Sequence, residues 1–195
     1  YPEAGRRSGR AACREPDLNI ALASISFVLA LMFALAGCTR LQVARIERNS
    51  PPVGAFEEIN GTRMHYVLVP AGPNADLPPI VFIHGASGNL KDPMVPFLPK
   101  LSGRAQMLFF DRPGHGWSSM GPEADDAIDQ QADTIALLMD KLGISSAIIV
   151  GHSMGGMALG RFCHRHEDLM VERCGALMFL DTSAAPLALP AALEA

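Results

Sequence analysis

A short sequence around Ser153 constrains the fold more than any other feature of this chain. The sequence Gly151-His152-Ser153-Met154-Gly155-Gly156 lies between an apolar run at residues 147–150 and a stretch of helical character at residues 154–166. A serine in a sharp strand-to-helix turn needs small residues two positions before and two positions after it, and Gly151 and Gly155 meet that need. The sequence therefore predicts a buried strand, a strained turn and a helix, with the serine hydroxyl at the end of the strand.

Short apolar runs recur along the chain and predict the other strands of a sheet. They are continuous rather than alternating, which is typical of parallel strands buried on both faces, and they lie at residues 80–83, 106–110, 147–150 and 174–180. Helical segments are expected between them, and the clearest, at residues 125–142, ends at Gly143. Because strands alternate with helices, we expect an α/β fold with a mostly parallel sheet flanked by helices.

An antiparallel hairpin is predicted before the parallel strands. Residues 56–59 and 62–69 favour β structure and are separated by Asn60-Gly61, a dipeptide that tolerates positive φ and favours a two-residue turn. In an open sheet of this kind, ligand chemistry gathers at the carboxyl ends of the parallel strands. Ser153 follows one such end.

Composition excludes several classes of function. Residues 56–195 carry nine basic and sixteen acidic residues, and this acidic balance argues against nucleic acid as a partner. The cysteines form no C-x-x-C pair and have no histidine at zinc-finger spacing, so neither a disulfide framework nor a zinc site is predicted from Cys13, Cys38, Cys163 and Cys174. We therefore expect no metal and no cofactor.

The turn at Ser153 also predicts an oxyanion hole. One donor is the backbone amide of Met154, at the positive N-terminal end of the expected helix. The second is the amide of Ala86, in the loop after residues 80–83. His84 is expected to brace this loop by hydrogen bonding. Support for the turn and the loop is assigned to Gly85, Gly151, His152 and Gly155.

Three motifs, in order along the chain, resemble the α/β-hydrolase superfamily. They are Ile83-His84-Gly85-Ala86, the segment FDRPGHGWS at residues 110–118, and the glycine-flanked serine motif at residues 151–156. The resemblance covers residues 56–186 and implies an esterase-like serine hydrolase, with Ser153 as the nucleophile and a small-molecule acyl compound as the substrate. His115 and Trp117 are candidates for the substrate pocket, although either side chain could equally pack against the protein.

The same resemblance leaves the triad acid and histidine unassigned, because in the family they follow later strands. We therefore expect this chain to be part of a longer α/β-hydrolase domain, with its C-terminal strands missing. Thioesterase, amidase, carbon–carbon hydrolase and cofactor-free peroxidase activities are alternatives on the same scaffold. An alternative of a different class is a membrane-tethered, non-catalytic remnant or binding protein that lacks the triad histidine.

The N-terminal segment predicts attachment to a membrane. An uncharged run at residues 18–37 is long enough, as a helix, to span about 30 Å. It ends in Leu35-Ala36-Gly37-Cys38, which resembles the lipobox of bacterial lipoprotein signal peptides, with Cys38 as the lipid-modified residue. A single-span anchor and an ordinary secretory signal also fit this run, and basic residues on both sides leave its orientation open.

These features predict three segments. Residues 1–38 form a basic N-terminus with a signal peptide or transmembrane anchor, residues 39–55 form a linker, and residues 56–195 form the partial hydrolase domain. The expected location is the bacterial cell envelope, either as a lipoprotein or on a single-span anchor.

Overall fold

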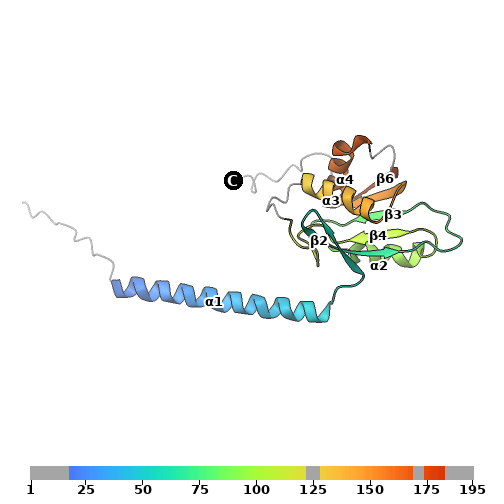
Figure 1. The fold of residues 1–195 in the computed structure, drawn as a ribbon. Helices are drawn as coiled ribbons and strands as arrows, with labels where there is room; N and C mark the ends of the chain where they lie inside the picture. Colours follow the sequence, from blue (N-terminus) through green and yellow to red (C-terminus); the bar gives the residue numbers. More distant parts are fainter. Residues whose placement is uncertain (1–17, 122–127, 169–173, 183–195) are drawn as a thin grey trace, which may run out of the picture. The chain divides into compact units, whose positions relative to one another are not determined.

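The computed structural model describes residues 18–121, 128–168 and 174–182. The chain divides into two compact units, Tyr1–Pro51 and Pro52–Ala195. The first contains helix α1 (Leu18–Asn49), and the second contains a six-stranded sheet with helices packed against it (Figure 1).

Helix α1 has 32 residues and is longer than the apolar run that predicted it. It continues through Cys38 and most of the predicted linker, so that only residues 50–54 lack regular structure before the sheet begins. The cause lies in the sequence, because residues 38–49 contain neither glycine nor proline and the next proline along the chain is Pro51. Within the described residues, α1 is the one helix long and apolar enough to cross a membrane, and a signal sequence would have the same features.

The sheet begins with the predicted hairpin. Strands β1 (Ala55–Ile59) and β2 (Thr62–Val69) are antiparallel, and both turn residues have positive φ, 48° at Asn60 and 76° at Gly61. The remaining strands are β3 (Ile80–Ile83), β4 (Met107–Phe110), β5 (Ala147–His152) and β6 (Cys174–Leu180). The order across the sheet is β1-β2-β4-β3-β5-β6, with β2 antiparallel to β4 and parallel pairing from β4 to β6.

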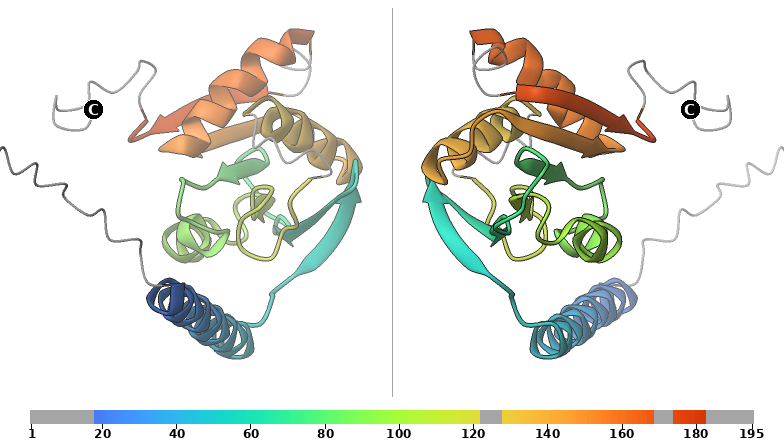
Figure 2. Two further views of the ribbon diagram at one scale, coloured as in Figure 1. Left: turned by 90° about the vertical axis from the view of Figure 1, so that its left-hand side faces the viewer. Right: turned by 90° about the vertical axis from the view of Figure 1, so that its right-hand side faces the viewer.

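Helices cover both faces of the central strands, as the continuous apolar runs predicted. Helix α2 (Lys91–Leu101) lies on one face, and α3 (Ile128–Lys141) and α4 (Met154–Arg165) lie on the other (Figures 1 and 2). Successive residues of a strand point to opposite faces, so Ile83 packs with the α3 and α4 side and Phe82 with the α2 side. The α/β fold with a mixed, mostly parallel sheet is confirmed.

The expectation that β6 is buried is wrong. Among the described strands, β6 lies at one edge of the sheet, and its five central residues are exposed, including Leu177, Met178 and Phe179. An apolar run at an edge has the same local sequence as one in the centre, because burial depends on which elements pack beside the strand.

Candidate active site

Ser153 occupies the predicted sharp turn between β5 and α4. Its backbone has φ 52° and ψ −121°, a conformation that residues other than glycine rarely adopt. The N–H of Ser153 donates to the carbonyl of Leu180 at the end of β6 (3.0 Å), and the hydroxyl of Thr182 donates to the carbonyl of Ser153. The strained turn is therefore held from the neighbouring strand, a contact that sequence analysis did not anticipate.

Glycines at the turn allow three segments to approach closely. A Cβ on Gly151 would lie 2.7 Å from the carbonyl oxygen of Gly155, and a Cβ on Gly155 would meet the backbone carbonyls of Ile83 and His84. These contacts are too short for any side chain, and the neighbouring atoms are backbone. Helix α4 can therefore start directly beside the end of β3 only because these positions are glycine.

The loop after β3 lies next to Ser153. A Cβ on Gly85 would be 3.3 Å from the Cβ of Ser153 and 3.2 Å from Nδ1 of His152. Ala86 follows Gly85, and Met154 is the first residue of α4. The structure therefore brings Gly85, His152 and Ser153 together at the carboxyl ends of β3 and β5.

His84 is buried and makes the predicted bracing contacts. Its Nε2 accepts from the backbone N–H of Arg112 (3.0 Å), and its Nδ1 donates to the carbonyl of Gly85 (2.8 Å). Burial lowers the pKa of His84 to about 4, with the positive charge of Arg112 as a smaller contribution, and the hydrogen bond to Gly85 opposes the shift. The ring is therefore neutral near pH 7, and its two nitrogens link the loops after β3 and β4 by hydrogen bonds.

Arg112 and His115 hold the same loop through its carbonyl oxygens. The fully buried guanidinium of Arg112 donates from Nη2 to the carbonyl of Gly85 (2.9 Å), and Nε2 of His115 lies 2.8 Å from the carbonyl of Ala86. His115 was predicted as a pocket residue, and here it contacts the loop after β3. Sequence analysis did not identify Arg112, which carried no signal beyond its place in the FDRPGHGWS segment.

Asp111, at the end of β4, organises the loop that carries these residues. One carboxylate oxygen accepts from the N–H of Leu90 (2.7 Å), and the other accepts from the N–H of Trp117 (2.8 Å) and from Nδ1 of His65 (2.7 Å). Asp111 and His65 are both buried. Trp117 is half-buried, and its backbone, rather than its ring, has the defined role in this network.

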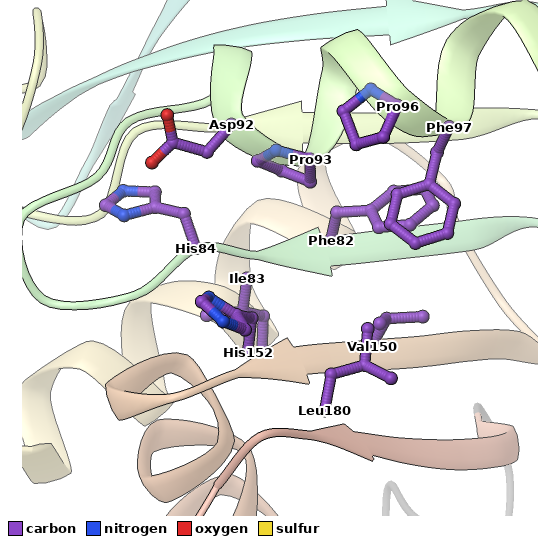
Figure 3. A pocket seen from close by; sticks show the side chains of 10 residues that line it. All are labelled: Phe82, Ile83, His84, Asp92, Pro93, Pro96, Phe97, Val150, His152 and Leu180. Atoms are coloured by element: carbon purple, nitrogen blue, oxygen red, sulfur yellow. The ribbon is translucent and has the colours of Figure 1, made fainter.

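A pocket of about 220 Å³ opens beside the turn, on the α2 face of the sheet. Its polar residues are His84, Asp92 and His152, and they lie at one end, whereas the rings of Phe82 and Phe97 line the other (Figure 3). Five further residues complete its wall: Ile83, Pro93, Pro96, Val150 and Leu180. Neither His115 nor Trp117 is among the lining residues.

Among the described residues, no group is hydrogen-bonded to the hydroxyl of Ser153. Burial raises the pKa of the Cys163 thiol, and it raises that of Cys174 to about 11, so neither thiol is reactive near pH 7. His166 is paired with Asp133 (2.9 Å) on the surface of α3 and α4. Within the same residues, no cluster of three or more ligating side chains could hold a metal ion.

The sequence is similar to a known protein family and to several curated proteins. Residues 78–194, more than half of the chain, match a family model described as alpha/beta hydrolase fold. The chain is 35% identical over 111 residues to the dihydrolipoyllysine-residue acetyltransferase component of the acetoin cleaving system of Cupriavidus necator, a match that covers 56% of this chain and 28% of that protein. It is 32% identical over 115 residues to a non-heme chloroperoxidase of Streptomyces lividans, covering 59% and 40% of the two chains.

A shorter match and two solved structures extend the comparison. The chain is 36% identical over 74 residues to a bifunctional esterase/perhydrolase of Acinetobacter calcoaceticus, covering 33% and 26% of the two chains. An N-acyl homoserine lactone degrading enzyme superposes with a TM-score of 0.55 at 25% identity, over 66% of this chain and 45% of that one. A meta-cleavage product hydrolase from Pseudomonas fluorescens superposes with a TM-score of 0.61 at 22% identity, over 73% and 50%, and shows likeness of fold alone. The chain thus spans half or less of the length of these proteins.

Proposed function

Because this chain belongs to the α/β-hydrolase family, we propose that it acts as a serine hydrolase on a carboxylic ester or a related acyl compound. The observation that carries the proposal is the backbone of Ser153, a non-glycine residue with φ 52° at the junction of β5 and α4. Such strain costs roughly 1–3 kcal/mol and persists where it serves a function. Here it presents a hydroxyl at the carboxyl end of a parallel strand, where chemistry gathers in this class of sheet.

The proposed reaction forms an acyl-enzyme on Ser153. The hydroxyl oxygen bonds to the acyl carbon, and the carbonyl oxygen of the substrate becomes an oxyanion that accepts hydrogen bonds from the N–H groups of Ala86 and Met154. The bond from the acyl carbon to the alkoxy oxygen of the substrate then breaks, and the leaving oxygen takes up the proton that the serine hydroxyl lost, which gives the alcohol and the acyl-enzyme. Attack by water on the acyl carbon breaks its bond to Ser153, returns a proton to the serine oxygen and releases the acid. The N-terminal end of α4 adds favourable positive potential at the oxyanion.

The neighbouring pocket supports an acyl substrate of modest size. Its walls are mainly apolar, from Phe82 to Leu180, and its polar end is formed by His84 and His152, which flank Gly85 and Ser153 in sequence. An apolar cavity with a few polar groups at one end is typical of a small-molecule site. A volume of about 220 Å³ favours a short acyl group over a long fatty chain.

The test is reaction with a fluorophosphonate, in which the serine oxygen bonds to phosphorus and fluoride leaves. We expect one label per molecule of purified protein, located at Ser153 by peptide mass spectrometry, together with hydrolysis of an activated ester such as p-nitrophenyl acetate. The Ser153→Ala variant should lose both activities, whereas Ser145→Ala, at an exposed position before β5, should keep them. Absence of labelling in the folded protein, or normal turnover by Ser153→Ala, would contradict the proposal and favour a non-catalytic role.

We further propose that α1 attaches the protein to a membrane of the bacterial envelope. Apolar side chains occur on every side of the helix between residues 18 and 37, and two hydroxyls are satisfied within the helix, Ser24 by the carbonyl of Ile20 (2.8 Å) and Thr39 by that of Leu35 (2.9 Å). Hydroxyls bonded in this way do not require water. At about 1.5 Å per residue, the helix exceeds the 30 Å of a bilayer core.

Membrane fractionation and mass measurement test this second proposal. Protein that stays in the membrane pellet at alkaline pH supports attachment, and release into the supernatant contradicts it. The mass of the N-terminus then separates the two forms. A diacylated Cys38 indicates a lipoprotein, and an uncleaved helix indicates a single-span anchor.

A further inference from the structure

The proposed reaction gives no role to Arg112, although its guanidinium is fully buried. Arg112 is the largest of the fully buried side chains, and arginine keeps its charge at any ordinary pH. Burying a charge is costly unless it is well paired. Two of its contacts lead in different directions, since Nη1 donates to Oε1 of Gln131 on α3 (2.5 Å) and Nη2 donates to the carbonyl of Gly85 (2.9 Å).

The carbonyl of Gly85 belongs to the peptide unit whose other end is the N–H of Ala86. The described chain contains no cis peptide bond, and in a trans, planar peptide the carbonyl and the N–H point in opposite directions. Three donors converge on this carbonyl: Nη2 of Arg112, Nδ1 of His84 (2.8 Å) and the backbone N–H of Gly88 (3.3 Å). They fix the direction of the Ala86 N–H, and a charged donor also polarises the unit, which makes that N–H a stronger donor.

The carbonyl of Ala86, in the next peptide unit, is also contacted by the loop after β4. Nε2 of His115 lies 2.8 Å from the carbonyl of Ala86 and 3.1 Å from Nη2 of Arg112, and its Nδ1 lies 3.0 Å from the carbonyl of Pro113. The carbonyls on both sides of Ala86 are therefore anchored to the loop after β4. Gly85, at the start of this anchored segment, is the residue whose Cβ would lie 3.3 Å from the Cβ of Ser153.

We propose that Arg112 is a positioning residue that orients and polarises the Gly85–Ala86 peptide, so that the Ala86 N–H binds the oxyanion formed at Ser153. This inference rests on the proposed function. It differs from a purely structural role, in which Arg112 would only link β4 to α3 through Gln131. The two roles separate in kinetics, because a positioned donor acts on the transition state and a structural link acts on the folded fraction.

The kinetic test uses Arg112→Met, Arg112→Lys and, as a control, Arg104→Met, whose side chain is exposed and paired with Asp76. For Arg112→Met we expect kcat for an activated ester to fall by about 10²-fold, the scale of losing one oxyanion donor, with KM little changed. A boronic acid, which forms a tetrahedral adduct with the serine, should lose affinity by a similar factor. Arg112→Lys, which keeps a charged donor, should recover part of the loss, and Arg104→Met should behave as wild type.

A second readout does not depend on activity. Protein labelled with carbonyl-¹³C glycine and ¹⁵N alanine gives signals from three Gly–Ala pairs, Gly54–Ala55, Gly85–Ala86 and Gly175–Ala176. In Arg112→Met we expect the Gly85 carbonyl and Ala86 amide signals to shift, while the other two pairs stay in place as internal controls. If Arg112→Met does not fold, the same signals are measured in Arg112→Lys and Gln131→Met, where we expect the Gly85 and Ala86 shifts to be smaller.

The outcomes separate the inference from the function on which it rests. An unchanged Gly85–Ala86 signal in a folded Arg112 variant overturns the inference, whatever the activity. A shifted signal with normal kcat, or a loss of kcat that only follows the unfolded fraction, overturns it as well. If the wild-type protein shows no reaction at Ser153, the proposed function fails, and the spectra still report whether Arg112 holds the peptide.

Discussion

The two halves of the candidate active site are held in place by different means. At Ser153 the geometry is fixed by the backbone, through positive φ and by glycines that allow α4 to touch the end of β3. At Gly85 and Ala86 it is fixed by side chains, through Arg112, His84 and His115 on the loop carbonyls. The serine turn tolerates little substitution because a Cβ at Gly151 or Gly155 would clash with backbone atoms. The second half resists change because buried polar groups would lose their partners.

The two halves should therefore be sensitive to different kinds of substitution. Substitutions at the serine turn act by steric overlap and should lower stability at any pH. Substitutions in the loop after β4 act through hydrogen bonds and charge, so their effects should depend on protonation and on the chemical character of the replacement.

The largest effect is expected from removing the carboxylate that organises the loop half. Asp111→Ala should lower the free energy of unfolding by about 3–5 kcal/mol, because it leaves a buried His65 and two backbone N–H groups without their acceptor. Asp76→Ala, which breaks an exposed pair with Arg104, is the matched control, and its loss should be much smaller because water screens the pair. Urea denaturation measures both. If both variants lost the same free energy of unfolding, burial of the Asp111 network would add nothing to stability.

In the turn half, Gly155→Ala should destabilise the protein by about 3 kcal/mol, the upper range for an overpacked site. The new Cβ meets the carbonyls of Ile83 and His84, which are backbone atoms and cannot rotate away. Gly160→Ala on the same helix has open space around the added Cβ and should stabilise the protein by about 0.5–1 kcal/mol. Effects of the same sign on unfolding would contradict the close approach of α4 to β3.

The loop half should also respond to pH through His84. Burial lowers its pKa from 6.5 to about 4, so as the pH falls the unfolded chain takes up a proton at this residue before the folded chain does. The free energy of unfolding should therefore decrease as the pH drops from about 6.5 to 4, by roughly 3 kcal/mol in all. His84→Gln removes this titration, and its stability curve should be flatter across that window. Parallel curves for the two proteins would refute the expected shift.

The smallest effect concerns backbone strain at Ser153 itself. Ser153→Gly relieves positive φ, whereas Ser153→Ala keeps it, so the glycine variant should be the more stable by about 1 kcal/mol after allowing for the greater entropy of glycine in the unfolded chain. Thermal unfolding of the two variants, both lacking the serine hydroxyl, gives this difference. An alanine variant of equal or higher stability would mean that the turn is not strained.

The serine turn could be predicted because its requirements are local. Gly151 and Gly155 stand at fixed distances from Ser153 in the sequence, and the apolar run before them predicts a strand. The structure has the strand, the turn and the helix at those positions. The roles of Ser153, Ala86 and Met154 in catalysis stay predictions until they are measured.

The other half could not be predicted in the same way. That Arg112 reaches Gly85 depends on β4 lying beside β3 in the sheet, and the sequence near Arg112 does not encode that neighbour. The same limit explains β6, whose apolar residues looked buried although the strand lies at an edge. Helix α2 was expected without bounds, and it contains Pro96 and Pro99, which normally disfavour helix.

The sequence position of the Asp111 network has a consequence for the order of events during synthesis. All its members, from Val53 to Trp117, lie in the part of the chain that leaves the ribosome first, whereas Ser153 and the strand that fixes its backbone follow much later. Contacts between distant segments form late because closing a long loop costs entropy. The loop half can therefore assemble while Ser153 is still being made, so the backbone of Ser153 gains its geometry only once β5 and β6 have joined the sheet.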